Sequence, residues 1–265
     1  MADDADVNGG ACPLPEADVN RAFFLDVDGT LLEIAETPSG VKVDPDLIDL
    51  IRRLHACAGG AIALISGRRI ADIDALFPDL RLPLAGQHGL ERRDPEGNCH
   101  SHEPEGVDWS WLKALVKGTF DETDGLLIED KGLTLAVHYR QKPAMEEAVA
   151  QALRHLVIDA GAAVVLQPGK CVLEVKPAGR DKGTAIAEFM SEPPFRGRRP
   201  VFIGDDVTDE YGFRMVNGLG GDSIKVGAGQ TAARWHLDDV QAVRAWLEAV
   251  IARTPGYDGN GGFRG

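Results

Sequence analysis

The stretch "FFLDVDGTLLE", residues 23–33, ends an apolar run with two carboxylates, Asp26 and Asp28, which stand two residues apart. Gly29 and Thr30 follow directly. Two acids this close raise each other's pKa unless a positive charge lies near them. The stretch therefore predicts a buried strand whose carboxyl end faces a cation.

The composition is that of a globular protein with an acidic surface. Hydrophobic residues make up 44% of the 265 residues, and 42 acidic against 28 basic side chains give a formal net charge of −14. Such a surface repels nucleic acid and anionic membranes, so we expect neither as a partner. The acidic start of the chain lacks the apolar segment of a signal peptide, and no apolar run approaches the ~18 residues of a membrane span.

The four cysteines are scattered and form no C-x-x-C pair, so they indicate neither a zinc site nor a disulfide framework. Reduced cysteines of this kind favour a cytoplasmic location.

Strand and helix signals alternate over the first third of the chain. Buried strands are expected at 22–27, 61–66 and 82–89, and amphipathic helices at 44–60 and 67–77. This order predicts a parallel sheet with helices on both faces. The same pattern resumes later, with helices expected at 182–190 and 238–253, a short helix between them, and strands at 200–206 and 223–227.

The middle of the chain follows another pattern, in which a helix and a hairpin occur twice. The helices are expected at 109–120 and 143–161, the first hairpin at 125–139 with its turn near 130–132, and the second at 162–175 with its turn at 168–169. The fold class is therefore α/β, a Rossmann-like doubly wound parallel-sheet core with a smaller inserted α+β domain. The expected divisions are a disordered tail at 1–20, the core at 21–104 and 178–253, the inserted domain at 105–177 and a flexible tail at 254–265.

Polar side chains follow several of the expected core strands. Asp26 and Asp28 follow the first, Ser66 the second, and Asp205, Asp206 and Asp209 the strand at 200–206. Each group alone suits a helix N-cap, but ligands of open parallel sheets bind at the carboxyl ends of strands, where all three groups fall. Converging carboxylates form an all-oxygen site that suits Mg²⁺. Lys182, at the start of a helix, suits a phosphate.

These residues carry a family resemblance. "DVDGT" (26–30), "SGR" (66–68), the lysine of "DKG" (181–183) and "GDDVTDE" (204–210) resemble the four motifs of the haloacid-dehalogenase-like phosphohydrolases, and the inserted domain lies where a type-two cap does in that superfamily. "GQHGLERR" (86–93), "EDKGLTLAVHYR" (129–140) and "PGKCVLEVKP" (168–177) are similar to the trehalose-6-phosphate phosphatase family. The resemblance implies a Mg²⁺-dependent phosphatase that hydrolyses trehalose 6-phosphate in trehalose biosynthesis.

The resemblance also implies a role for each matching residue. Asp26 would attack phosphorus and form an aspartyl-phosphate, and Asp28 would act as acid and then base, with its carbonyl on Mg²⁺. Asp26 and Asp205 would be the other metal ligands, and Ser66 and Lys182 would hold the phosphoryl oxygens. Asp206 and Asp209 are outer-shell candidates. The expected substrate-binding residues are Gly29, Gly67, Arg68, Gln87, His88 and Gly89 in the core, and Glu129, Lys131, Arg140, Lys170 and Glu174 in the cap.

Other readings of the sequence stay open at this point. A capped phosphatase for another sugar phosphate, such as a sucrose or mannosylglycerate phosphate, would carry the same core motifs. A non-catalytic sugar-phosphate sensor would be expected to have lost Asp26 or Asp28, and a glycosyltransferase reading of "DDVT" gives no reason for Lys182. We expect a small-molecule sugar phosphate as the partner, Mg²⁺ as the cofactor and a monomer.

Overall fold

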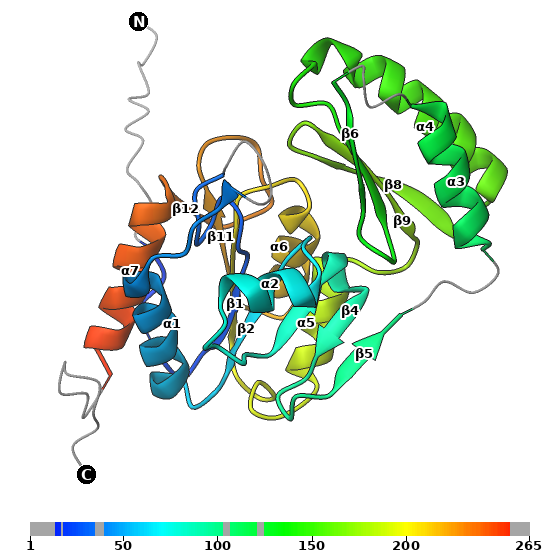
Figure 1. Cartoon of the computed structure of the whole chain (residues 1–265). Helices are drawn as coiled ribbons and strands as arrows, with labels where there is room; N and C mark the ends of the chain where they lie inside the picture. The colour runs from blue at the N-terminus through cyan, green and yellow to red at the C-terminus, as the bar shows by residue number, and fades with distance from the viewer. Residues whose placement is uncertain (1–13, 17, 35–39, 103–106, 121–124, 255–265) are drawn as a thin grey trace, which may run out of the picture.

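The computed structural model describes residues 14–16, 18–34, 40–102, 107–120 and 125–254. Their strands form two separate sheets (Figure 1). The larger has eight strands in the order β12-β11-β10-β1-β2-β3-β4-β5, and the smaller has four in the order β6-β7-β9-β8. The expected tails at 1–20 and 254–265 lie mostly outside the described residues.

Six neighbouring strands of the large sheet run parallel, which confirms the predicted α/β class. They are β12 (Trp235–Leu237), β11 (Asp222–Val226), β10 (Pro200–Gly204), β1 (Ala22–Leu25), β2 (Ile62–Ile65) and β3 (Leu84–Gly86).

The predicted sheet was incomplete at both edges. Two antiparallel strands, β4 (Glu91–Arg93) and β5 (Cys99–Ser101), extend it beyond β3, and β12 forms the other edge. Strands of three residues are too short for a hydrophobic period to reveal them. The strand expected at 82–89 ends at Gly86, because a 3₁₀ turn, η2 (Gln87–Gly89), follows with His88 in the left-handed region.

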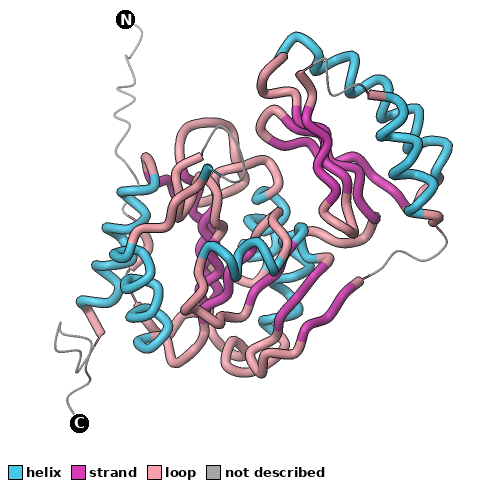
Figure 2. The backbone as a smooth tube through the Cα atoms, in the orientation of Figure 1, coloured by secondary structure: helices cyan, strands magenta, loops and turns pink. Residues whose placement is uncertain are grey.

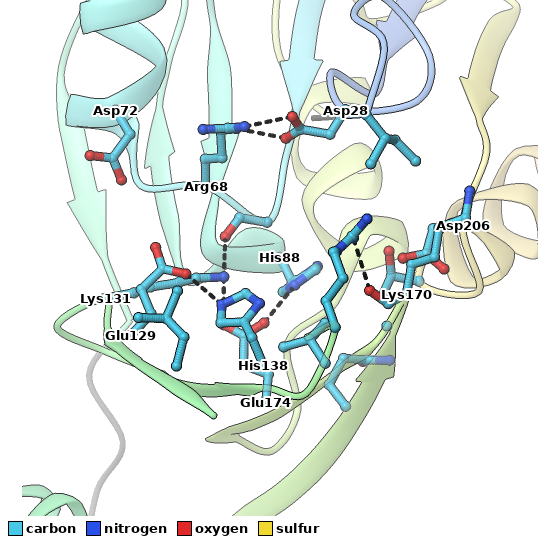
Figure 3. Close-up of a pocket in the computed structure, with 18 of the residues that line it drawn as sticks. Asp28, Arg68, Asp72, His88, Glu129, Lys131, His138, Lys170, Glu174 and Asp206 are labelled. Carbon is cyan, nitrogen blue, oxygen red and sulfur yellow. Dashed lines mark hydrogen bonds and ion pairs between the residues drawn. The ribbon is translucent and has the colours of Figure 1, made fainter. Parts of the chain in front are cut away.

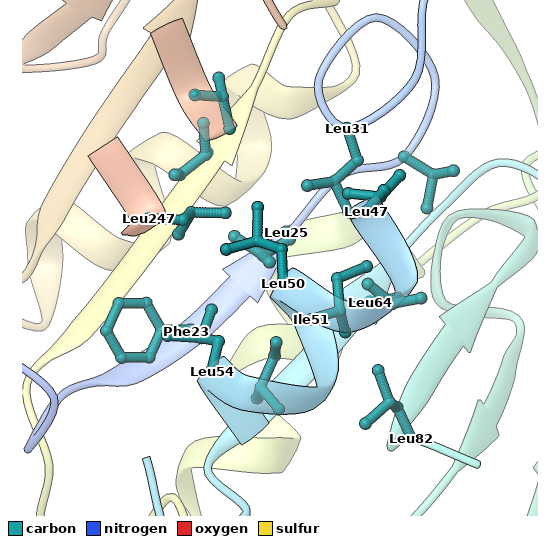
Figure 4. Packing of buried hydrophobic residues seen from close by; sticks show 14 of the residues in the cluster. Phe23, Leu25, Leu31, Leu47, Leu50, Ile51, Leu54, Leu64, Leu82 and Leu247 are labelled. Atoms are coloured by element: carbon teal, nitrogen blue, oxygen red, sulfur yellow. The ribbon is translucent and has the colours of Figure 1, made fainter. Parts of the chain in front are cut away.

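Helices cover both faces of the large sheet, as predicted. On one face α1 (Pro45–Cys57), α2 (Ile70–Leu76) and α7 (Val240–Ala252) enclose an aliphatic core with Phe23 and Leu25 of β1 (Figure 4). On the other face α5 (Lys182–Met190) and α6 (Asp209–Gly218) pack over Phe24. Since alternate residues of β1 point to opposite faces, all of this strand is buried.

The small sheet has a hydrophobic core of its own. Its strands are β6 (Leu127–Asp130), β7 (Leu135–His138), β8 (Val164–Gly169) and β9 (Val172–Pro177). Helices α3 (Trp109–Thr119) and α4 (Glu146–Ala160) cover the face that points away from the large sheet, and a short 3₁₀ turn, η4 (Pro143–Met145), precedes α4 (Figures 1 and 2). The uncovered face is therefore directed toward the large sheet.

The turn predicted at 168–169 was placed two residues too early. β8 continues through Pro168 to Gly169, and the chain reverses at Lys170 and Cys171, where Cys171 has a φ of 61°. Proline and glycine are strong turn signals, but an edge strand tolerates both. The turn of the first hairpin follows Asp130, close to its predicted position.

Among the described helices, none combines the length and the apolar character needed to cross a bilayer.

Candidate active site

The carboxyl ends of β1 and β10 bring the predicted acids together. Asp26 follows β1 and Asp205 follows β10, and these two strands are parallel neighbours. Lys182 opens α5, and its ammonium donates to Asp26 Oδ1 at 2.7 Å and to Asp209 Oδ1 at 2.6 Å. All three side chains in these contacts are buried. Lys182 thus supplies part of the positive charge that the opening stretch requires.

One ammonium does not balance the carboxylates around it. Burial raises the pKa of Asp26 well above its ordinary range, and Asp209 and Asp205 raise it further while Lys182 opposes them. Burial and Asp209 also raise the pKa of Asp205 to about 6. Burial by itself would lower the pKa of Lys182, but Asp209 and Asp26 raise it above the ordinary value. The cluster therefore favours a further cation.

The donor atoms fit a small divalent ion. Asp26, Asp205 and Asp209 each place one carboxylate oxygen within 4.8 Å of the others. Asp205 Oδ1 is buried and has no hydrogen-bond partner among the described residues. An all-oxygen donor set with an unpaired carboxylate oxygen suits Mg²⁺.

Asp209 is the buried anchor of this region. Its Oδ1 accepts from Lys182, and its Oδ2 accepts from the backbone N–H of Asp206 at 2.9 Å. Asp206 in turn accepts from the N–H of Val207 at 2.6 Å. Both acids therefore shape the loop after β10, and their outer-shell roles stay a prediction.

Gly29 is required where the two acidic segments meet. Its φ is +81°, and a Cβ built on it would lie 2.1 Å from Asp205 Oδ2. The Asp205 carboxylate therefore occupies the space that a side chain at position 29 would fill. Gly29 was expected to serve the substrate, but in the structure it lies against Asp205.

Asp28 is held by a guanidinium. Arg68 donates from Nε to Asp28 Oδ2 and from Nη2 to Asp28 Oδ1, both at 2.7 Å (Figure 3). The backbone N–H of Arg68 donates to Ser66 Oγ at 3.1 Å, and Ser66 is buried. This bidentate pair fixes Asp28 between the first and second motifs.

Glu174 joins the small sheet to the large one. This carboxylate is 4% exposed. It contacts His88 Nε2 at 3.0 Å and Lys131 Nζ at 3.4 Å, and the hydroxyl of Thr134 donates to it (Figure 3). Burial alone would raise the pKa of Glu174, but Lys131 and His88 hold it below its ordinary value. Lys131 also donates to the carbonyl of Gly67 at 3.2 Å, so polar side chains close this junction.

The surroundings of His88 favour the neutral imidazole. Burial lowers its pKa, against the attraction of Glu174. Since the ionised Glu174 can only accept, Nε2 of His88 carries the proton. Nδ1 is buried without a partner in the described part of the chain, and it is left as a hydrogen-bond acceptor.

The other predicted cap residues also have partners. Glu129 contacts His138 at 2.9 Å, and Arg140 donates to the carbonyl of Lys170 at 3.2 Å. The side chain of Lys170 is 61% exposed, and its ammonium lies 3.7 Å from Asp205 Oδ2.

A cleft of about 930 Å³ lies between the two sheets, at the upper end of the usual size of ligand pockets. Most of the predicted site residues line it, namely Asp26, Asp28, Gly67, Arg68, His88, Glu129, Lys131, Arg140, Lys170, Glu174, Lys182, Asp205 and Asp206.

Five predicted residues do not line the cleft, namely Gly29, Ser66, Gln87, Gly89 and Asp209. Gln87 is fully buried and donates to Glu91 at 2.7 Å, and a Cβ on Gly89 would lie 2.8 Å from the carbonyl of Asp181. We infer that Gly29, Gln87, Gly89 and Asp209 support the site through their neighbours, and the role of Ser66 toward the phosphoryl group stays a prediction.

Sequence reasoning missed several residues of the cleft wall, among them Arg69, Asp72, His138, Gln167 and Thr208. His138 stands two residues before Arg140, so strand alternation could have found it. Gln167 pairs with Glu174 across β8 and β9, but the misplaced turn concealed this register.

A buried carboxylate paired with a lysine at the carboxyl end of a parallel strand, beside a separate α+β unit, is the arrangement of the capped phosphohydrolases. A family model described as trehalose-phosphatase matches residues 24–255. The chain is 44% identical to the trehalose-6-phosphate phosphatase of Escherichia coli over 89% of this chain and 88% of that one. It is 47% identical to a probable trehalose-phosphate phosphatase of Sinorhizobium fredii over 87% and 88%. The chain belongs to the trehalose-phosphatase family.

The fold agrees with a solved structure as well. The C-terminal domain of the trehalose-6-phosphate phosphatase of C. albicans superposes with a TM-score of 0.76 at 22% identity, over 87% of this chain and 91% of that one. At this identity the likeness concerns the fold alone.

Replacing Gly29 by Ala should disable the site without unfolding the chain. The new Cβ would displace the Asp205 carboxylate, and a displacement of about 1 Å can cost about a hundredfold in rate. Phosphate release and thermal melting measure the two effects. Gly97→Ala is the matched control, because Gly97 has a φ of +90° and nothing within 4 Å. It should lose about 1–2 kcal/mol of stability and keep its activity. A folded Gly29→Ala variant with full activity would contradict the assigned contact.

Proposed function

We propose that this chain hydrolyses trehalose 6-phosphate to trehalose and inorganic phosphate, with Mg²⁺, through an aspartyl-phosphate on Asp26. The observation that carries the proposal is the buried contact of Lys182 with Asp26 and Asp209 under a polar cap face. The names of the E. coli and S. fredii relatives supply the substrate.

In the first step Asp26 attacks phosphorus as the carboxylate. The bond from phosphorus to the sugar oxygen breaks, and Asp28 gives that oxygen its proton. In the second step Asp28 takes a proton from water, which attacks the phosphoryl group and restores Asp26. The cation, held by Asp26, Asp205 and the carbonyl of Asp28, would neutralise charge on the phosphoryl oxygens.

Lys182 and Ser66 hold the phosphoryl oxygens during both steps. Arg68 can contact both Asp28 and the substrate phosphate in this mechanism. Its guanidinium donates to both oxygens of Asp28 in the structure and so orients this carboxylate. An incoming phosphate dianion offers the guanidinium an alternative acceptor.

The inserted unit, which we assign to residues 105–177, serves as the cap over a core of residues 21–104 and 178–253. Its face presents Glu129, Lys131, Arg140, Lys170 and Glu174 to the sugar hydroxyls. Because Lys131 and Glu174 contact each other and the core loops, hydroxyl groups replace part of these contacts when substrate enters. A monomeric, cytoplasmic enzyme stays our prediction.

Phosphate release across a panel of sugar phosphates, each with Mg²⁺ and with excess chelator, tests the function. Trehalose 6-phosphate should give the highest kcat/KM, and chelator should abolish turnover. A higher kcat/KM on sucrose or mannosylglycerate phosphate would assign the chain to another sugar phosphate. Full turnover in chelator would refute the metal site.

Asp26→Asn should reduce turnover to less than a thousandth of wild type while the fold persists. An amide neither attacks phosphorus nor offers a cation a negative charge. The measurement is phosphate release at saturating substrate, with Asp79→Asn, an exposed acid, as the control. Turnover by Asp26→Asn above that level would rule out Asp26 as the nucleophile.

Lys170→Ala should lower kcat/KM for trehalose 6-phosphate by about 1.5–3 kcal/mol, the range of a hydrogen bond to a charged group. A small aryl phosphate should be hydrolysed as well as by wild type, because it does not reach the cap. Arg154→Ala, at an exposed cap position, is the control. Equal losses on both substrates would mean that Lys170 acts through Asp205, which lies 3.7 Å away, and not on the sugar.

A further inference from the structure

Lys225 is a buried lysine that the proposed mechanism does not use. It lies on β11, in the apolar run "SIKV", and is 7% exposed. Its ammonium donates to the backbone carbonyl of Asp205. A lysine is seldom buried unless its charge has partners, so this contact calls for an explanation.

The contact falls at the point where β10 ends. The register of β10 and β11 pairs Gly204 with Lys225, and Asp205 is the next residue after the strand. A backbone carbonyl at the end of a buried strand needs a donor, since leaving it unpaired costs about 1–3 kcal/mol. Lys225 supplies that donor from the neighbouring strand and so fixes the main chain of Asp205.

The side chain of Asp205 is confined as well. Its carboxylate fills the space left by the missing side chain of Gly29, and its Oδ1 is buried without a partner. A small rotation of the Asp205 main chain would move this oxygen away from those of Asp26 and Asp209. The position of the carboxylate therefore depends on the contact at the carbonyl.

The charge of Lys225 and its hydrogen bond have opposite effects on a cation at this site. A positive charge nearby repels a divalent ion, so its loss alone would tighten binding. If Asp205 is held in place, its carboxylate needs no reorganisation when the cation binds. Loss of the hydrogen bond from Lys225 would therefore weaken cation binding. The cations that act most on the pKa of Asp205 are Lys182 and Lys170. Lys225 acts on the main chain.

We infer that Lys225 is a positioning residue, which orients Asp205 for a divalent cation by holding its backbone carbonyl. The inference rests on the Mg²⁺ site of the proposed function, and it does not depend on which sugar phosphate is hydrolysed.

Calorimetric titration of Mg²⁺ into the metal-free full chain tests it without substrate. Lys225→Met removes both the charge and the donor, and should raise the dissociation constant about tenfold, which is about 1.4 kcal/mol. Lys225→Arg keeps both and should stay within about threefold of wild type. Lys176→Met is the matched control. Lys176 is an equally buried ammonium that donates to the carbonyl of Arg180, but it lies on β9 of the cap. Its loss should leave Mg²⁺ binding unchanged.

The titrations distinguish the role of Lys225 from the existence of the Mg²⁺ site. Unchanged or tighter binding by a folded Lys225→Met variant would overturn the positioning role, and tighter binding would leave repulsion as the only effect. If Lys225→Met does not fold, Lys225→Ala leaves room for a water molecule and is judged by the same titration. Absence of Mg²⁺ binding by wild type would refute the metal site itself, and not the role of Lys225 alone.

Discussion

The ammonium of Lys182 is the interaction on which the site depends. It lies between Asp26 at the end of β1 and Asp209 at the start of α6, and so ties both of these segments to α5, the helix that Lys182 opens. Without it three neighbouring acids would repel each other in a buried place. Because one positive charge does not balance them, the same contact leaves the region electrostatically ready for a cation and a phosphate.

Polar contacts join the small sheet to the large one in the described part of the chain. Glu174 on β9 meets His88 of the core, while Lys131 reaches the carbonyl of Gly67 in the second motif. Hydrogen bonds of this kind exchange with water or with sugar hydroxyls at little net cost, whereas an apolar interface would resist opening. In the proposed function, the same side chains would therefore both hold the small sheet against the large one and recognise the substrate.

The sequence predicted the residues whose positions are set by strand topology. It did not predict those whose positions depend on a local turn or on a single side-chain contact. Asp26 and Asp205 could be placed because parallel strands deliver their ends to one edge of a sheet, a rule that needs no side-chain detail. The burial of Gln87 could not be predicted, because it results from a 3₁₀ turn in which His88 lies in the left-handed region. Lys225 was passed over because a lone lysine in an apolar strand carries no pattern, and its partner is a backbone carbonyl 20 residues away.

The two acidic motifs form one packing unit although the chain separates them widely. Gly29 of the first motif leaves the space for the carboxylate of Asp205 in the fourth motif. Within the fourth motif, Gly204 leaves the space for Asp209, whose Cγ would lie 2.3 Å from a Cβ at position 204. Each glycine is thus explained by an aspartate, and the contact of Gly29 with Asp205 joins the two motifs. The core motifs are specific sequence signals because their contacts lie within the protein. The predicted cap residues are weaker signals because, in the proposed function, part of their bonding would be completed by the substrate.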